Sequence, residues 1–66
     1  MATTIMIEGM SCGHCVMAVT KALSGVAGVK NVRVNLERGE ATFDEESPVP
    51  RELLREAVRK AGYETP

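Results

Sequence analysis

The apolar residues of this 66-residue chain follow two spacings, and the spacing changes several times along the sequence. In residues 3–8 isoleucine alternates with other side chains, which is typical of a half-buried strand. After Cys15 the apolar residues recur every three or four positions, which predicts a helix that ends at Ser24-Gly25. Strands and helices therefore follow one another within a short chain, which predicts an α+β fold.

The second half of the chain repeats this order. Residues 29–36 alternate again, and Val29 is out of phase, so we expect a bulge or bend near Lys30-Asn31. Residues 37–40 predict a hairpin turn in which Gly39 has a positive φ, and a partner strand follows through residues 41–43. The side chains expected to face inward from the first of these strands are Val32, Val34 and Leu36.

A second helix and a short final strand complete the predicted order β-α-β-β-α-β. Pro50 suits the first position of the helix, and Gly62 is suited to the position just after its end. Residues 63–65 are expected to form a short edge strand. We therefore predict a ferredoxin-like βαββαβ sandwich, a four-stranded antiparallel sheet with two helices on one face, as one domain over residues 1–66.

Length and composition exclude several function classes. A chain this short can build one core but no deep substrate pocket as well, which argues against an enzyme. The net charge is -1, and one Tyr, one Phe and no Trp are present, so neither a basic field nor stacking platforms favour nucleic acid. No apolar run is long enough for membrane insertion and the N-terminus lacks a signal-peptide pattern, so a cytoplasmic protein is expected.

The chemistry is concentrated in residues 9–15, Gly-Met-Ser-Cys-Gly-His-Cys, an exposed loop expected between the first strand and the first helix. In a reducing compartment two cysteines at this spacing indicate a metal or redox pair. A structural zinc site needs four ligands, and His14 is the only histidine. The thiolates of Cys12 and Cys15 instead suit a soft ion that accepts two ligands. Cu(I) fits best and Ag(I) or Hg(II) also fit, while Zn(II) or Cd(II) are substitutes.

The two cysteines are predicted to behave differently. Cys15 starts the helix, so the helix N-terminus should lower the pKa of its thiol and favour the ligating thiolate. Cys12 lies on the loop and should remain mobile. Mobility of one ligand suits a protein that transfers its metal.

The motif in residues 9–15, together with Gly28-Val29 and Gly62-Tyr63, resembles the heavy-metal-associated domain over essentially the whole chain. Bacterial copper chaperones of the CopZ type show the same features, as do the N-terminal metal-binding domains of copper-transporting P-type ATPases. The resemblance implies a metallochaperone that binds Cu(I) and passes it to the metal-binding domain of such an ATPase. It equally fits a domain excised from an ATPase.

The resemblance also assigns roles around the two cysteines. It implies that Cys12 and Cys15 bind Cu(I), that Met10 packs beneath the loop and that Tyr63 lies near it. Zinc-exporting relatives tend to carry Asp just before the first cysteine, whereas Ser11 stands here, which favours copper. A monomer is expected without metal, and two loops that share Cu(I) across a two-fold axis would form a metal-bridged dimer.

Three roles have alternatives. His14 is either a solvent-facing loop residue or a pH-sensitive additional ligand. Met10 is either a packing residue or a third, thioether ligand, with packing favoured. Tyr63 either closes the edge of the core or shields the metal.

A rival function belongs to another class. Cys-Gly-His-Cys also occurs as the active-site tetrapeptide of thiol–disulfide oxidoreductases, in which a helix N-terminus activates a thiolate. Those enzymes carry Trp before the first cysteine within a larger thioredoxin-like domain, and this chain has Met10-Ser11 and no Trp. The sequence therefore favours metal binding.

Overall fold

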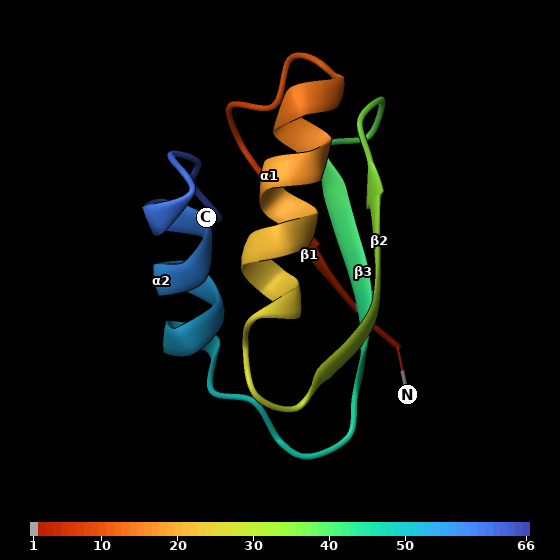
Figure 1. The fold of residues 1–66 in the computed structure, drawn as a ribbon, viewed down its shortest axis with the longest axis vertical. Helices are drawn as coiled ribbons and strands as arrows, with labels where there is room; N and C mark the ends of the chain where they lie inside the picture. Colours follow the sequence, from red (N-terminus) through yellow and green to blue (C-terminus); the bar gives the residue numbers. More distant parts are fainter. Residues whose placement is uncertain (1) are drawn as a thin grey trace.

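Two helices lie on one face of an antiparallel sheet in the computed structural model, which describes residues 2–66 (Figure 1). The sheet has the strand order β1-β3-β2, and both of its pairings are antiparallel. This arrangement confirms the predicted fold class. The elements in chain order are β1 (Ala2–Met6), α1 (Gly13–Ser24), β2 (Val29–Asn35), β3 (Glu40–Glu45) and α2 (Arg51–Lys60).

The hydrophobic core lies between the helices and the sheet. Its fully buried large side chains come from both helices and the central strand: Val19, Leu23, Phe43 and Val58. Burial of a side chain of this size contributes roughly 1.5–3 kcal/mol. The core is completed by Ile5, Ile7, Val29, Ala41 and Leu54. Neither helix of residues 2–66 has the length and apolar character needed to cross a membrane.

The predicted irregularities of β2 and the hairpin are confirmed. The register between β2 and β3 shifts between Lys30 and Arg33, and Asn31 has a φ of 52°. The bulge explains why Val29 is buried although it is out of phase with the rest of the strand. Gly39 has a φ of 64°, and its carbonyl accepts a 2.7 Å hydrogen bond from the backbone N–H of Ile7.

The predicted fourth strand is wrong, because the sheet has three strands. Residues 63–65 contribute only an isolated bridge between Glu8 and Glu64, with one backbone hydrogen bond in each direction. In this register Met6 lies opposite Pro66. Proline has no backbone N–H to donate to the Met6 carbonyl, so the ladder cannot continue. Within residues 2–66 this bridge is therefore all that is bonded to the outer edge of β1.

Three smaller expectations also need correction. Leu36 is exposed rather than buried, because β2 ends at Asn35 and the turn begins. Pro50 precedes α2 in an extended conformation, and its carbonyl accepts from the backbone N–H of Leu53. The first helix begins at Gly13, before Cys15.

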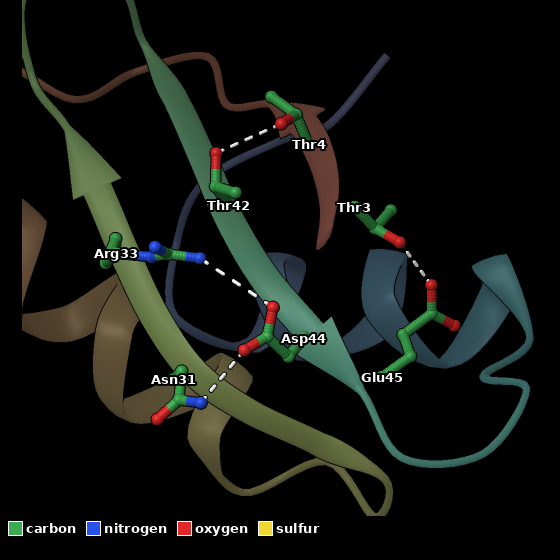
Figure 2. Close-up of polar contacts among 7 residues, drawn as sticks. All are labelled: Thr3, Thr4, Asn31, Arg33, Thr42, Asp44 and Glu45. Atoms are coloured by element: carbon green, nitrogen blue, oxygen red, sulfur yellow. Dashed lines mark hydrogen bonds and ion pairs between the residues drawn. The ribbon is translucent and has the colours of Figure 1, made fainter. Parts of the chain in front are cut away.

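The sheet face that the helices do not cover carries a polar network (Figure 2). Thr4 and Thr42 face each other across β1 and β3 with their hydroxyl oxygens 3.0 Å apart. Asp44 on β3 accepts a 2.9 Å hydrogen bond from Asn31 and lies 3.8 Å from the Arg33 guanidinium. These contacts connect all three strands and stabilise the bulged part of β2 against β3.

Candidate metal site

The loop that leads from β1 to α1 is shaped by its backbone. Gly9 has a φ of 98°, a conformation that side-chain-bearing residues rarely adopt. A Cβ atom at Gly9 would lie 3.4 Å from Cδ1 of Tyr63, so the tyrosine ring packs directly beside this turn. The Glu8–Glu64 bridge fixes the same segment of chain one residue earlier. The start of the loop and the end of the chain are thus held together.

Cys12 and Cys15 lie at the start of α1, with their sulfur atoms 3.7 Å apart. Cys12 is the N-cap residue in an extended conformation, and its carbonyl accepts backbone N–H groups of Cys15 at 3.0 Å and Val16 at 3.3 Å. A disulfide would place the sulfurs about 2.05 Å apart, so both thiols are free. Cys12 is exposed and Cys15 is buried, which corrects the expectation that both thiolates lie on an exposed loop.

The pKa of the Cys15 thiol is lowered to about 6. The largest cause is a hydrogen bond from the Tyr63 side chain, which favours the thiolate, and the backbone of Ser11 contributes in the same direction. Burial opposes these effects, and hydrogen bonds from Cys12 add smaller ones. The same contact raises the pKa of Tyr63, because its proton is held by the thiolate.

The remaining candidate residues differ in their contacts and in their burial. The Ser11 hydroxyl oxygen lies 3.9 Å from the Cys15 sulfur. Met10 and Tyr63 are partly buried against the core, and His14 is exposed on the first turn of α1. Within residues 2–66 no group of three or more His, Cys, Asp or Glu side chains is positioned to hold an ion.

The end of α2 positions Tyr63 beside Cys15. Gly62 has a φ of 95°, its N–H donates to the Arg59 carbonyl at 3.0 Å, and the Tyr63 N–H donates to the Val58 carbonyl at 3.1 Å. These bonds form a Schellman-type helix end that turns the chain toward the cysteine loop. Periodicity predicted Gly62 as the helix stop but gave no direction for Tyr63. The edge strand predicted over residues 63–65 is reduced to the Glu8–Glu64 bridge, and the part of this bridge in holding Tyr63 beside the loop was not predicted.

The cysteine pair lies apart from the large hollow of this fold. A hollow of about 670 Å³ lies between α1 and α2. Its lining shares no residue with the cysteine loop and includes Ala18, Ala22, Val26, Leu53 and Ala57, with Lys21, Glu56 and Lys60 among the other members. The pair is open to solvent on the side of Cys12.

The sequence and the fold both match those of known proteins. The heavy-metal-associated domain model matches residues 4–64. The chain belongs to this family. This heavy-metal-associated domain is 41% identical over 59 residues to the copper chaperone CopZ of Staphylococcus aureus, covering 88% of this chain and 87% of that protein.

Solved structures agree with this assignment of the heavy-metal-associated domain. A structure described as a CopZ metallochaperone superimposes with a TM-score of 0.88 at 36% identity, and the match covers 100% of both chains. A copper-binding domain from HMA7, a P-type ATPase, superimposes with a TM-score of 0.86 at 29% identity, covering 98% of this chain and 89% of the other. The family thus includes both free chaperones and domains of transporters.

Proposed function

We propose that this domain is a metallochaperone that carries Cu(I) on Cys12 and Cys15 and transfers it to a metal-binding domain of a copper-transporting P-type ATPase. The observation that carries the proposal is the pair of free sulfurs 3.7 Å apart at the start of α1, one exposed and one buried. The likeness to proteins named as copper chaperones supports the choice of metal and the carrier role.

The donor set supports a soft ion with few ligands. Thiolates prefer Cu(I) and related soft ions, whereas structural zinc sites use four ligands. A zinc–sulfur bond is about 2.3 Å long, and with bonds of similar length a nearly linear arrangement would need sulfurs roughly 4.6 Å apart. The present separation is 3.7 Å, so loading requires a movement of about 1 Å. Cys12 is exposed and its side chain makes no capping hydrogen bond, so it is the ligand free to move.

Transfer by thiolate exchange follows from the same asymmetry. A thiolate of the target forms a bond to Cu(I) on the exposed side, giving a three-coordinate ion. The Cys12–copper bond then breaks, and the Cys12 thiolate takes up the proton that the target thiol released. A second target thiolate replaces Cys15 in the same way, and copper remains Cu(I) throughout. The Tyr63 hydrogen bond and the lowered pKa stabilise the departing Cys15 thiolate.

Competition for Cu(I) tests the binding step. The reduced protein is titrated against bicinchoninate under anaerobic conditions, and one Cu(I) per chain is expected to leave the chelator. The Cys12→Ser and Cys15→Ser variants are each expected to lose this ability, because one thiolate remains. His14→Ala is the matched control, since His14 is exposed, and it should retain the stoichiometry of the parent. Retention of full competition by both serine variants would refute the site.

Transfer to the target is tested separately. Cu(I)-loaded protein is mixed with the ¹⁵N-labelled metal-binding domain of a copper-transporting ATPase, and the amide spectrum of that domain is expected to shift to its metal-bound form. No transfer, together with intact Cu(I) binding, would reject the chaperone role and leave the role of an ATPase domain. The genomic neighbourhood of the coding sequence distinguishes these two settings.

The oxidoreductase alternative is less well supported by the geometry. A thiolate that attacks a substrate disulfide must be accessible. Here the thiol with the lowered pKa is Cys15, which is buried, whereas Cys12 is exposed. Reduction of insulin by glutathione in the presence of the protein should therefore proceed at the uncatalysed rate. Multiple turnovers lost in Cys12→Ser would favour the enzyme instead.

A further inference from the structure

The hollow of about 670 Å³ between α1 and α2 lies on the solvent side of the two helices. Within residues 2–66 its lining belongs to the helices and to the residues that directly follow them, and no strand contributes to it. The core side chains Leu23 and Val58 are not part of the lining, so the hollow opens away from the sheet. The helices that form its two walls run in opposite directions (Figure 1).

The floor of the hollow is made by small side chains. Ala18 and Ala22 of α1 and Ala57 of α2 line it, and all three are half-buried. Small residues on a helix surface allow a further helix to approach closely, because the distance between helix axes depends on the side chains at the contact. The hollow is therefore a hole that offers room for a larger apolar side chain.

A large apolar side chain stands at the rim of this hole. Leu53 of α2 is 45% exposed, whereas its neighbour Leu54 is 4% exposed and belongs to the core. Leu53 lines the hollow together with Ala57, which lies one turn further along the same helix. One face of the molecule thus carries both halves of a knob-into-hole contact, an exposed leucine and an alanine-lined hole.

The same face carries charges of both signs. Lys21 of α1 and Glu56 and Lys60 of α2 line the hollow, and all three residues are exposed. The ion pairs found within residues 2–66 join β2 to β3 and to the loop after β3, so they involve none of these three groups. A partner surface of a single charge sign would meet a like charge here, whereas a face with both signs can complement a copy of itself.

We propose that this face binds a second copy of the chain, in a symmetric homodimer in which α2 of each copy lies against α1 of the other. Leu53 enters the alanine-lined hole of the second copy, and Glu56 pairs with Lys21 of the second copy. Because a two-fold interface repeats every contact, the knob and the ion pair each occur twice. The helices of the two copies form one four-helix layer between the two sheets.

The dimer is expected to be weak. Each copy contributes only the outer faces of one helix of 12 residues and one of 10 residues, and interfaces below about 1,200 Å² are typical of transient complexes. The cysteine loop is not part of the face, so association needs no metal and does not depend on the proposed function. It differs from the metal-bridged dimer suggested by the sequence, and at high protein concentration it replaces the expected metal-free monomer.

Self-association of the metal-free protein is the first test. The protein is kept reduced with a chelator present, so that no ion can bridge two cysteine loops. Sedimentation velocity over a roughly hundredfold range of concentration is expected to show a monomer–dimer equilibrium. In ¹⁵N-labelled protein the amide signals of Ala22, Leu53 and Ala57 should shift with concentration, whereas those of β2 should not. Cys12→Ser should associate like the parent.

Charge reversal separates contacts between copies from contacts within one chain. Lys21→Glu places a carboxylate against Glu56 of the second copy, and Glu56→Lys places an ammonium group against Lys21. Each variant alone should therefore dimerise at least about tenfold more weakly than the parent. An equimolar mixture of the two variants should recover dimerisation, because both ion-pair positions of the mixed dimer then hold opposite charges. A pair formed within one chain cannot produce this recovery.

Matched variants control for net charge and for the exposed apolar side chain. Arg38→Glu changes the net charge as Lys21→Glu does, but it lies in the hairpin turn and should dimerise like the parent. Leu53→Gln removes the knob and should weaken dimerisation at least about tenfold, while glutamine's helix propensity keeps α2 folded, as circular dichroism can verify. Met17→Gln, on an exposed side of α1 outside the hollow, should have no effect.

Three results would overturn the proposal. The first is a single species of monomer mass throughout the concentration range. The second is a parental dimer whose strength is unchanged in Leu53→Gln or is not recovered in the mixture of charge variants. The third is a set of concentration-dependent shifts confined to β1 or the cysteine loop, which would assign the association to another surface.

Discussion

The sulfur atoms of Cys12 and Cys15 lie 3.7 Å apart, yet one cysteine is exposed and the other is buried against Tyr63. Under the proposed function, the two cysteines would meet different requirements of a metal carrier. Cys15 would offer a thiolate that is stabilised before metal arrives, because the pKa of its thiol is about 6. Cys12 would offer the ligand that is accessible to a partner. A symmetrical pair of buried thiols would hold an ion but could not release it to another protein as readily.

The first prediction concerns the pKa of Cys15. At neutral pH a thiol with a pKa of about 6 is largely ionised. Removal of the Tyr63 hydroxyl in Tyr63→Phe deletes the largest stabilising contact, so the pKa should rise toward the ordinary value of a thiol. The rate of iodoacetamide alkylation as a function of pH measures this change, with the midpoint expected to move to higher pH.

The control for this experiment isolates a single thiol. Cys12→Ser leaves only Cys15 to react, and Thr65→Ala, near Tyr63 in sequence, should not move the midpoint. The lowered pKa also has a consequence for stability. Because the folded pKa lies below the unfolded one, the thiolate contributes stability above the unfolded pKa, and this contribution is lost as the pH falls through about 6. An unchanged midpoint in Tyr63→Phe would contradict the assigned contact.

The order of elements could be predicted because each element has a clear spacing. The apolar stripe that includes Val19 and Leu23 predicted α1, and the alternation around Phe43 predicted β3. The fourth strand could not be predicted in this way. Its absence depends on which residue faces Met6, and this register is known only once Glu8 and Glu64 are paired. A local pattern contains no information on pairing between distant segments.

The residues of the candidate site could be predicted from the sequence, but their burial and hydrogen bonds could not. The spacing of the sequence identified Cys12 and Cys15. The position of Cys15 at the helix N-terminus predicted a lowered pKa for its thiol. The largest cause is instead Tyr63, from the far end of the chain. The family resemblance placed Tyr63 near the loop, yet spacing alone could not assign it a hydrogen bond. Burial of Cys15 was also unexpected, because its polar and glycine neighbours in sequence say nothing of the core beneath it.

A second prediction is that the protein folds without metal. The core of apolar side chains between α1, α2 and the sheet does not depend on an ion. Circular dichroism in the presence of a chelator should show a cooperative thermal transition. Phe43→Ala is expected to cost about 3–5 kcal/mol, most of the stability of a domain of this size. Met17→Ala, at a 70% exposed site, should cost less than about 0.5 kcal/mol. A metal-dependent transition would contradict this view.

A third prediction compares two glycines. Gly28 has a φ of 91°, and an added Cβ would lie 2.8 Å from the Ser47 hydroxyl oxygen and 3.2 Å from Val49. Gly28→Ala should therefore destabilise the protein by about 1–3 kcal/mol. At Gly13, within α1, an added Cβ meets nothing within 4 Å. Gly13→Ala should be neutral or stabilising by up to about 1 kcal/mol. Urea denaturation of both variants measures the difference, and equal effects would argue against the strained turn.

The fourth prediction concerns the missing strand. Pro66 lies opposite Met6 in the register set by Glu8 and Glu64, and it lacks the N–H that the Met6 carbonyl would accept. Pro66→Thr supplies this donor and should add one backbone hydrogen bond. When fully formed, this bond should raise the free energy of unfolding by about 0.5–1.5 kcal/mol. Slow hydrogen exchange of the amide that this substitution introduces measures the new bond. Pro48→Thr, in the loop before α2, is the control because it removes a proline without facing β1.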